Sequence, residues 1–232
     1  MEITRELKRT LREQGFIPLR DNINFAVRII VPCGILTTET SNKITELAEK
    51  YGRGKFYLTQ RLGIEIPFIK YENLEIVKKE LADVGLDIGG TGKKVRAILT
   101  CKGSICRSGL YDSEALTEHF NKKFYIGYHY TELPNKFKIV VGGCKNNCSR
   151  PTVADVGLTG VELGRVEIRI GGLSGKSQIF GKLLPKTYSL SEAEEVIEKC
   201  LNYYIDNGIS GERFGNMIER IGYEHILEHI CN

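Results

Sequence analysis

Apolar and polar positions alternate in short runs along the chain, and these runs predict a mixed α+β protein. Residues 2–14 place aliphatic side chains at helical spacing, whereas residues 24–31 are typical of a strand that Pro32 stops. Further elements are expected as a helix over 37–51, strands over 55–59 and 64–69, and a helix over 72–84. The first part of the chain therefore has the order β-α-β-β-α after an initial surface helix.

A Gly-rich polar segment, residues 86–94, separates these elements from a second set. There the pattern predicts strands over 95–100, 136–141, 156–159 and 166–170, a helix over 112–120, and helices from residue 189 onward. We expect a ferredoxin-like half-domain over residues 1–92, an α/β domain over 93–185, and a helical tail over 186–232 that packs on the core.

Composition and charge narrow the class of protein. The chain has 232 residues, of which 41% are hydrophobic and 27% are charged, as in ordinary globular proteins. The net charge of +4 is too small to indicate nucleic acid as the main partner, although it allows a local basic pocket. No apolar run approaches the roughly 18 residues of a membrane span, and the amino terminus lacks a signal-peptide core. These features predict a soluble, cytoplasmic protein with no membrane partner.

Cysteine spacing gives the strongest chemical signal. Four of the seven cysteines form two close pairs, Cys101 with Cys106 and Cys144 with Cys148, each in a polar turn after a predicted strand. Two pairs of thiolates on neighbouring strand ends can converge on one inorganic centre. Structural zinc sites more often use the tighter C-x2-C spacing, whereas a 4Fe–4S cluster suits wider loops such as these C-x4-C and C-x3-C turns. Spacing alone favours iron–sulfur and leaves zinc open.

The residues around these cysteines resemble the cluster-binding signature of the sulfite and nitrite reductases that pair sirohaem with a 4Fe–4S centre. The segments that carry the resemblance are Gly142–Pro151 (GGCKNNCSRP), Asp155–Gly160 (DVGLTG), Arg28–Gly34 (RIIVPCG), Tyr57–Arg61 (YLTQR) and Leu133–Lys138 (LPNKFK). They cover about residues 20–185. Because only one set of motifs is present, the chain resembles the small, single-module sulfite reductases of anaerobes.

The resemblance implies which residues hold the cofactors. The four cluster ligands would be Cys101, Cys106, Cys144 and Cys148, and Cys148 would also bridge to the sirohaem iron as its proximal ligand. The carboxylates of sirohaem need cations and hydrogen-bond donors. Arg61 matches the family arginine for that task, and further candidates are Thr59, Gln60, Asn146, Asn147 and Arg150. The Gly-rich stretch Gly171–Lys176 would let the backbone approach the macrocycle.

A small oxyanion that is reduced needs both positive charge and protons. Arg96, Lys136 and Lys138 match the family's substrate residues, and the two lysines alternate on one predicted strand and so share a face. Arg28 is a further catalytic candidate, although the family arginine lies two residues later, where this chain has Ile30. Two other departures are the C-x4-C spacing, one residue tighter than the C-x5-C of the larger enzymes, and Cys33 in place of a turn glycine.

The leading hypothesis is a sirohaem-dependent reductase that takes sulfite to sulfide in a six-electron reaction. The alternatives are nitrite reduction to ammonia by the same site, a 4Fe–4S electron-transfer subunit without haem catalysis, and a zinc-stapled binding module. The sequence has no Rossmann or flavin motif, so electrons are expected from ferredoxin or a partner redox subunit, and homo-oligomer formation stays open. Cys33, Cys200 and Cys231 have no motif context, and His225 and His229 are expected to form an exposed helical pair rather than a metal site.

Overall fold

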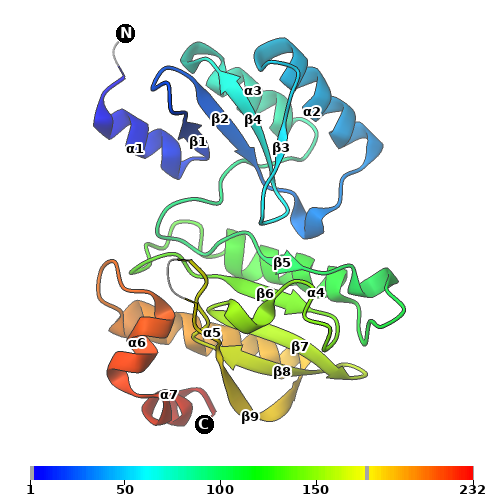
Figure 1. Ribbon diagram of the computed structural model, residues 1–232, viewed down its shortest axis with the longest axis vertical. Helices are drawn as coiled ribbons and strands as arrows, with labels where there is room; N and C mark the ends of the chain where they lie inside the picture. Colours follow the sequence, from blue (N-terminus) through cyan, green and yellow to red (C-terminus); the bar gives the residue numbers. More distant parts are fainter. Residues whose placement is uncertain (1–2, 176–177, 232) are drawn as a thin grey trace. The chain divides into compact units, whose positions relative to one another are not determined.

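The computed structural model describes residues 3–175 and 178–231, which form two compact units that divide between Gly92 and Lys93 (Figure 1). Residues 1–2, Lys176 at the end of the Gly-rich stretch, and the side chain of Cys231 lie outside the described part. Within the described part, no helix combines the length and the apolar character needed to cross a membrane.

Unit 1 (residues 1–92) is an antiparallel sheet of four strands in the order β1-β2-β4-β3. Its elements are α1 (Arg5–Glu13), β1 (Phe16–Pro18), β2 (Phe25–Ile29), α2 (Thr38–Tyr51), β3 (Tyr57–Leu58), β4 (Ile64–Ile69) and α3 (Leu74–Ala82). Helices α2 and α3 contact each other and bury their apolar faces in the same core as β2 and β4. The β-α-β-β-α order is present as predicted, and the α+β class is confirmed.

Local chemistry explains where the elements of unit 1 begin. Thr37 caps α2, because its hydroxyl accepts from the Thr40 amide while the Thr40 hydroxyl accepts from the Thr37 amide. The short strand β1 was not predicted. Its three residues lie between Gly15 and a chain reversal, so they offer too few positions for a period-2 pattern, yet Phe16 is completely buried.

Unit 2 (residues 93–232) is a five-stranded sheet in the order β5-β6-β7-β8-β9. The first three strands are parallel, and β8 and β9 continue the sheet antiparallel. Its elements are β5 (Leu99–Thr100), α4 (Ser113–Phe120), β6 (Ile139–Gly142), β7 (Val156–Glu162), β8 (Arg165–Ile170), β9 (Lys182–Ser189), α5 (Leu190–Asn207), α6 (Phe214–Ile221) and α7 (Tyr223–Cys231). A π-helical turn over Asn121–Ile126 extends α4.

The strands of unit 2 differ from the predicted pattern in three places, and the first is β5, which begins at Leu99, four residues later than expected. β6 begins at Ile139, three residues later than expected, and only an isolated bridge between Val95 and Phe137 continues the pairing upstream. β9 was not predicted, because Pro185 and its lysines hide the pattern, but an edge strand tolerates a proline. β9 also runs through the boundary expected between residues 185 and 186.

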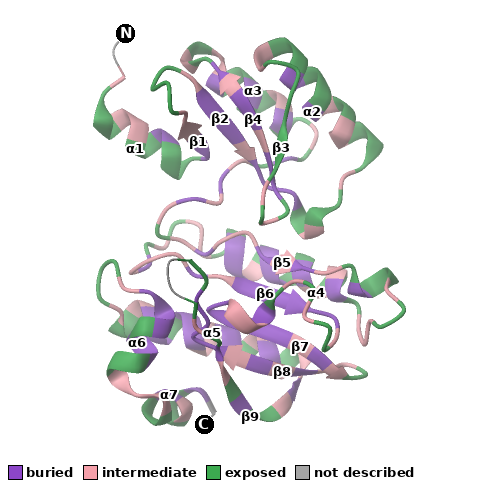
Figure 2. Cartoon of the chain, in the orientation of Figure 1, coloured by how far each residue is buried: buried purple, intermediate pink, exposed green. Residues whose placement is uncertain are grey.

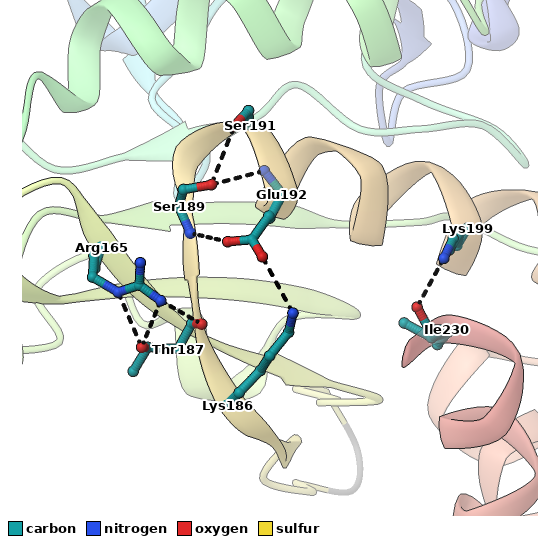
Figure 3. Close-up of polar contacts among 8 residues, drawn as sticks. All are labelled: Arg165, Lys186, Thr187, Ser189, Ser191, Glu192, Lys199 and Ile230. Atoms are coloured by element: carbon teal, nitrogen blue, oxygen red, sulfur yellow. Dashed lines mark hydrogen bonds and ion pairs between the residues drawn. The ribbon is translucent and has the colours of Figure 1, made fainter. Parts of the chain in front are cut away.

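The helices after β9 belong to the same core as the sheet. One hydrophobic cluster joins residues from Val95 to Ile230, and burial is concentrated in the central strands and in the inward faces of α5 and α6 (Figure 2). Helix α5 begins at a capping box in which Ser189 and Glu192 exchange backbone and side-chain hydrogen bonds (Figure 3). Lys199 on α5 donates to the carbonyl of Ile230, which joins α5 to α7 (Figure 3).

Candidate functional site

The two cysteine-bearing turns meet at one edge of the sheet in unit 2. β5 and β6 are parallel neighbours, with Thr100 paired to Val141, so the turns that follow them leave the same edge side by side. The amide of Gly143 donates to the Sγ atom of Cys101 at 3.2 Å. This bond links the second turn to the first thiol, and backbone donors of this kind stabilise the negative charge of thiolates and cluster sulfurs.

Glycines allow this close approach. A Cβ on Gly143 would lie 3.0 Å from the Cα of Gly103 and 3.3 Å from the Cys101 sulfur. A Cβ on Gly160, in β7, would lie 2.5 Å from the carbonyl oxygen of Gly143. Strand β7 and the two turns are therefore packed backbone against backbone, which explains why glycine occupies these positions.

Tyr111 and Ser113 donate hydrogen bonds to the backbone of the two turns. Neither residue is part of the sequence motifs. The Tyr111 hydroxyl donates to the carbonyl of Gly142 at 2.9 Å, and the Ser113 hydroxyl donates to the carbonyl of Cys101 at 3.0 Å. Burial raises the pKa of Tyr111, and negative charge on Cys101 and Cys144 raises it further. The phenol is therefore a neutral donor next to two of the predicted ligands.

The second turn is shaped by its polar residues. Asn147 and Arg150 both adopt left-handed backbone angles, with φ of 57° and 61°. The Asn147 amide group donates to Thr152 at 3.2 Å, and the Ser149 hydroxyl donates to the carbonyl of Val141 at 2.9 Å. Asn147 thus serves the turn itself. The same turn leaves Cys148 exposed to solvent, together with the predicted sirohaem residues Asn146 and Arg150.

The donor set is made of sulfur atoms. Cys101, Cys106, Cys144 and Cys148 are all free thiols, and the first three are half-buried. Among the described residues, no group of three or more His, Cys, Asp or Glu side chains is placed to hold a metal ion. Four cysteine thiolates are the ligand set that a 4Fe–4S cluster uses.

The basic residues predicted to bind the anion in unit 2 flank one bridge between two chain segments. Val95 pairs with Phe137, and the amide of Arg96 donates to the carbonyl of Phe137 at 2.8 Å. Phe137 is completely buried between the half-buried Lys136 and Lys138. The alternation predicted for the two lysines is therefore retained, although they precede β6 rather than lie within it.

In unit 1, the predicted sirohaem residues lie on the β3–β4 hairpin. The Thr59 hydroxyl accepts from the amides of Arg61 and Gly63, at 3.3 and 3.0 Å, so this side chain closes the turn. Gln60 at the tip is exposed, and Arg61 is half-buried. The Thr59 side chain thus stabilises the turn on which Gln60 and Arg61 lie.

Arg28 lies across the sheet from Glu65, and the two side chains form an ion pair. Nη2 and Nε of Arg28 both contact Oε1 of Glu65, at 2.6 and 2.7 Å. These residues are also register partners on β2 and β4. The ion pair neutralises charge that Arg28 would otherwise present to an anion, which weighs against its predicted catalytic role.

Two glycine-related expectations have structural explanations. Cys33, where the family has a turn glycine, adopts a left-handed conformation with φ of 57°, which is the conformation that favours glycine. Gly171 and Gly172 are required by internal packing. A Cβ on Gly171 would lie 2.7 Å from Ile218, and one on Gly172 would lie 2.4 Å from the carbonyl oxygen of Ala154. Both glycines therefore serve packing within unit 2, and we do not assign them to the macrocycle.

The histidines on α7 pack against α5. His225 Nδ1 lies 3.1 Å from the Tyr203 hydroxyl, and the His229 ring lies 4.7 Å from the Tyr203 ring, measured between centroids. These contacts give both rings a structural role.

The structure defines an α+β protein with two cysteine-bearing turns at the carboxyl ends of two parallel strands. Two family models match the chain: "Nitrite/Sulfite reductase ferredoxin-like half domain" over residues 17–84 and "Nitrite and sulphite reductase 4Fe-4S domain" over residues 91–232. The chain belongs to the nitrite and sulfite reductase family and is an oxidoreductase. The cofactors of this family are a 4Fe–4S cluster and sirohaem.

Individual relatives differ in how much of their length the chain covers. It is 29% identical to an assimilatory-type sulfite reductase of Nitratidesulfovibrio vulgaris over 219 residues, which are 94% of this chain and 97% of that protein. It is 30% identical to a nitrite reductase [NAD(P)H] of Bacillus subtilis over 83% of this chain, but spans only 23% of that protein. It is 34% identical to a coenzyme F420-dependent sulfite reductase of Methanocaldococcus jannaschii over 66% of this chain and 24% of that protein.

Solved structures share the fold. The chain superposes on a crystal structure of dissimilatory sulfite reductase I with a TM-score of 0.81 at 17% identity, covering 90% of this chain and 69% of that one. The structure of the Mycobacterium tuberculosis NirA protein gives a TM-score of 0.81 at 18% identity, covering 97% of this chain and 47% of that one.

Proposed function

We propose that this chain catalyses the six-electron reduction of sulfite to sulfide. The observation that carries the proposal is the junction of the two cysteine turns through Gly143 and Cys101, in a chain of this family. Sulfite is favoured over nitrite by the similarity to the Nitratidesulfovibrio vulgaris protein, because the alignment covers nearly the full length of both chains. Nitrite reduction to ammonia by the same residues is the second candidate.

Four thiolates would hold the cluster, those of Cys101, Cys106, Cys144 and Cys148. Cys148 is the exposed member, which suits its predicted position as the thiolate shared with the sirohaem iron. Within unit 2, Asn146 and Arg150 would pair with carboxylates of sirohaem; within unit 1, Arg61 and Gln60 on the β3–β4 hairpin are the candidates for the same chemistry. When bound, the two groups would supply electrons one at a time and a metal centre at which the anion is reduced.

The basic residues of the chain would have three roles in this reaction. Arg96, Lys136 and Lys138 would attract the dianion, hold positive charge where its oxygens depart, and donate protons from the lysine Nζ atoms as those oxygens leave as water. The backbone bond from Arg96 to Phe137 ties the two segments that carry these side chains. We leave Arg28 out of this group, because Glu65 already binds its guanidinium.

Electrons would come from an external carrier, ferredoxin or a partner redox subunit. Lys102, Arg107 and Lys145 are exposed on the two cysteine turns. An acidic electron carrier would be attracted to such a basic surface near the cluster, with an association rate that falls as salt is added.

The first test is an anaerobic visible spectrum of the purified protein, with extraction of pigment and counts of iron and acid-labile sulfide. The proposal predicts sirohaem bands and about four irons per chain beyond the haem iron. A cluster spectrum that stays haem-free when sirohaem is supplied would instead support the electron-transfer subunit. Zinc without sulfide would refute both.

Two variants then test the residue roles. Cys148→Ser should abolish the coupling between cluster and haem spectra, and unchanged spectra would refute the bridging assignment. Lys136→Ala combined with Lys138→Ala should lower sulfite turnover while both cofactors remain bound. The matched control is Lys78→Ala combined with Lys79→Ala, which removes two exposed lysines from α3. Equal turnover in the two double variants would show that Lys136 and Lys138 have no role in the reaction.

A further inference from the structure

A buried ion pair lies directly behind one of the predicted substrate lysines. Asp155 is completely buried and Arg213 is 8% exposed. Nη2 of Arg213 contacts both carboxylate oxygens of Asp155, at 2.9 and 2.7 Å. Burial raises the pKa of Asp155, and the guanidinium opposes that change by stabilising the carboxylate. Neither residue has a role in the cofactor or anion assignments above.

Asp155 holds the backbone of Lys138. Its Oδ2 atom accepts the Lys138 amide at 2.9 Å, and the next residue, Val156, donates its amide to the Lys138 carbonyl at 3.0 Å. Regular pairing between β6 and β7 starts one residue later, with Ile139 opposite Val156. The Asp155 side chain therefore supplies the hydrogen bond that the ladder does not supply at Lys138.

Arg213 is the residue before α6. Helix α6 is seated closely, since a Cβ on Gly215 would lie 2.2 Å from the carbonyl oxygen of Gly171. The Gly171 amide in turn donates to the carbonyl of Asp155 at 2.8 Å. Both the backbone and the side chain of Asp155 are thus fixed by the α6 region.

The loop between α5 and α6 also holds the other end of the lysine segment. The Gly211 amide donates to the carbonyl of Pro134 at 2.8 Å, and the Asn135 side chain donates to the carbonyl of Gly211 at 2.7 Å. The Asn135 side chain also accepts the amide of Lys136 at 2.8 Å. Residues 134–138 are therefore fastened at both ends by side chains and backbone outside the sheet.

We propose that Asp155 and Arg213 are positioning residues, which set the backbone at Lys138 and thereby the direction of its ammonium group toward the anion. The inference rests on the proposed role of Lys138. A buried ion pair is a weak source of stability, because desolvation offsets most of its attraction, so stability alone accounts poorly for its presence. A fixed backbone matters more, because a small misplacement of a reacting group lowers the rate steeply.

Two double variants separate positioning from stability. Asp155→Asn with Arg213→Met removes both charges but keeps a side-chain oxygen that can accept the Lys138 amide. Asp155→Leu with Arg213→Met removes both charges and that acceptor. Since both variants avoid a lone buried charge, both are expected to fold. The loaded holoenzyme is used throughout, and cofactor content is measured for each variant.

The second double variant should lose kcat/KM for sulfite on the order of 10- to 100-fold, with normal cofactor spectra, while the first stays within about threefold of wild type. Amide hydrogen exchange gives a readout independent of turnover. Of the two double variants, only the one that carries Asp155→Leu should exchange the Lys138 amide faster, because only that one lacks the acceptor. The Phe137 amide, which donates to the carbonyl of Lys94, is the internal reference.

Equal kcat/KM in the two double variants, or unchanged exchange at Lys138 after Asp155→Leu, would overturn the inference. If Lys138→Ala alone leaves turnover intact, the proposed role of Lys138 is refuted. The exchange result then still decides whether Asp155 holds the Lys138 amide. Arg213→Lys provides a milder change, because it keeps the charge but loses the guanidinium geometry. It should also speed exchange at Lys138 and lower kcat/KM, and wild-type values for both would count against the inference.

Discussion

Gly160 occupies the position where β7 passes closest to the second cysteine turn, so Gly160→Ala tests how that turn is held. The added methyl carbon would lie 2.5 Å from the carbonyl oxygen of Gly143 and 2.9 Å from its carbonyl carbon. Both are backbone atoms, which cannot rotate away. Gly143 must therefore shift by a sizeable part of an ångström, and Cys144 follows it in the chain.

The expected cost has two sources. Overpacking of a tight interior typically costs about 1–3 kcal/mol. A displaced Gly143 also weakens two hydrogen bonds. Its amide donates to the Cys101 sulfur at 3.2 Å, and its carbonyl accepts from the Leu110 amide at 3.0 Å. Each bond contributes about 0.5–1.5 kcal/mol. We expect a loss of about 2–6 kcal/mol in the free energy of unfolding, and the displaced turn should hold the cluster poorly.

The assay is iron and acid-labile sulfide per chain, measured with anaerobic urea unfolding. Gly175→Ala is the matched control, because no atom of the described residues lies within 4 Å of a Cβ placed there. The control should keep full cluster content and wild-type stability. A Gly160→Ala protein with the same cluster content and stability as the control would refute the account of how β7 supports the turn.

Three smaller changes probe other parts of the fold. Tyr111→Phe removes the donor to the Gly142 carbonyl and should lower the free energy of unfolding by about 1 kcal/mol in urea titrations; no change would show that the bond is dispensable. Cys33→Gly should be neutral or stabilising by up to about 1 kcal/mol in thermal unfolding, because the left-handed φ of 57° disfavours a side chain; clear destabilisation would contradict this. The pKa of Glu192 is lowered to about 2, chiefly by the Ser189 amide, so its ionised form stabilises the fold above the unfolded pKa and this contribution is lost as pH falls from about 4.3 toward 2. The destabilisation by Glu192→Gln, measured by urea unfolding, should therefore be constant between about pH 7 and 5 and should shrink at lower pH; a difference that grows in acid would contradict the assignment.

Elements with strong local signals were predicted closely from the sequence. Helix α2 begins where Thr37 offers a capping hydroxyl, and β4 spans Ile64–Ile69 as its alternating pattern indicated. Both signals lie within a few residues of the element they define. β9 shows the opposite case, because Pro185 and the neighbouring lysines are acceptable only at a sheet edge, and the edge position follows from the whole topology.

The candidate site divides in the same way. The cysteine pairs can be found from spacing, because each pair lies within one turn. The supports of those turns cannot, since Tyr111 reaches Gly142 across 31 positions of the chain and Arg213 reaches Asp155 across 58. A lone tyrosine or arginine has no local pattern that distinguishes a support from a surface residue, so these partners emerge only from the fold.

The polar residues of a motif therefore fall into two groups, those whose side chains already bond within the protein and those whose side chains are exposed. Thr59 and Asn147 match the sequence pattern, yet their side chains hold the turns on which they lie. Arg28, a catalytic candidate two residues from the family position, is already paired with Glu65. By contrast, Gln60 and Cys148 are presented to solvent by those same turns, which makes them better candidates for contact with a cofactor. The motifs of this chain therefore contain two kinds of residue. Thr59 and Asn147 shape the turns, whereas Gln60 and Cys148 are exposed on them, and the side-chain hydrogen bonds tell the two kinds apart.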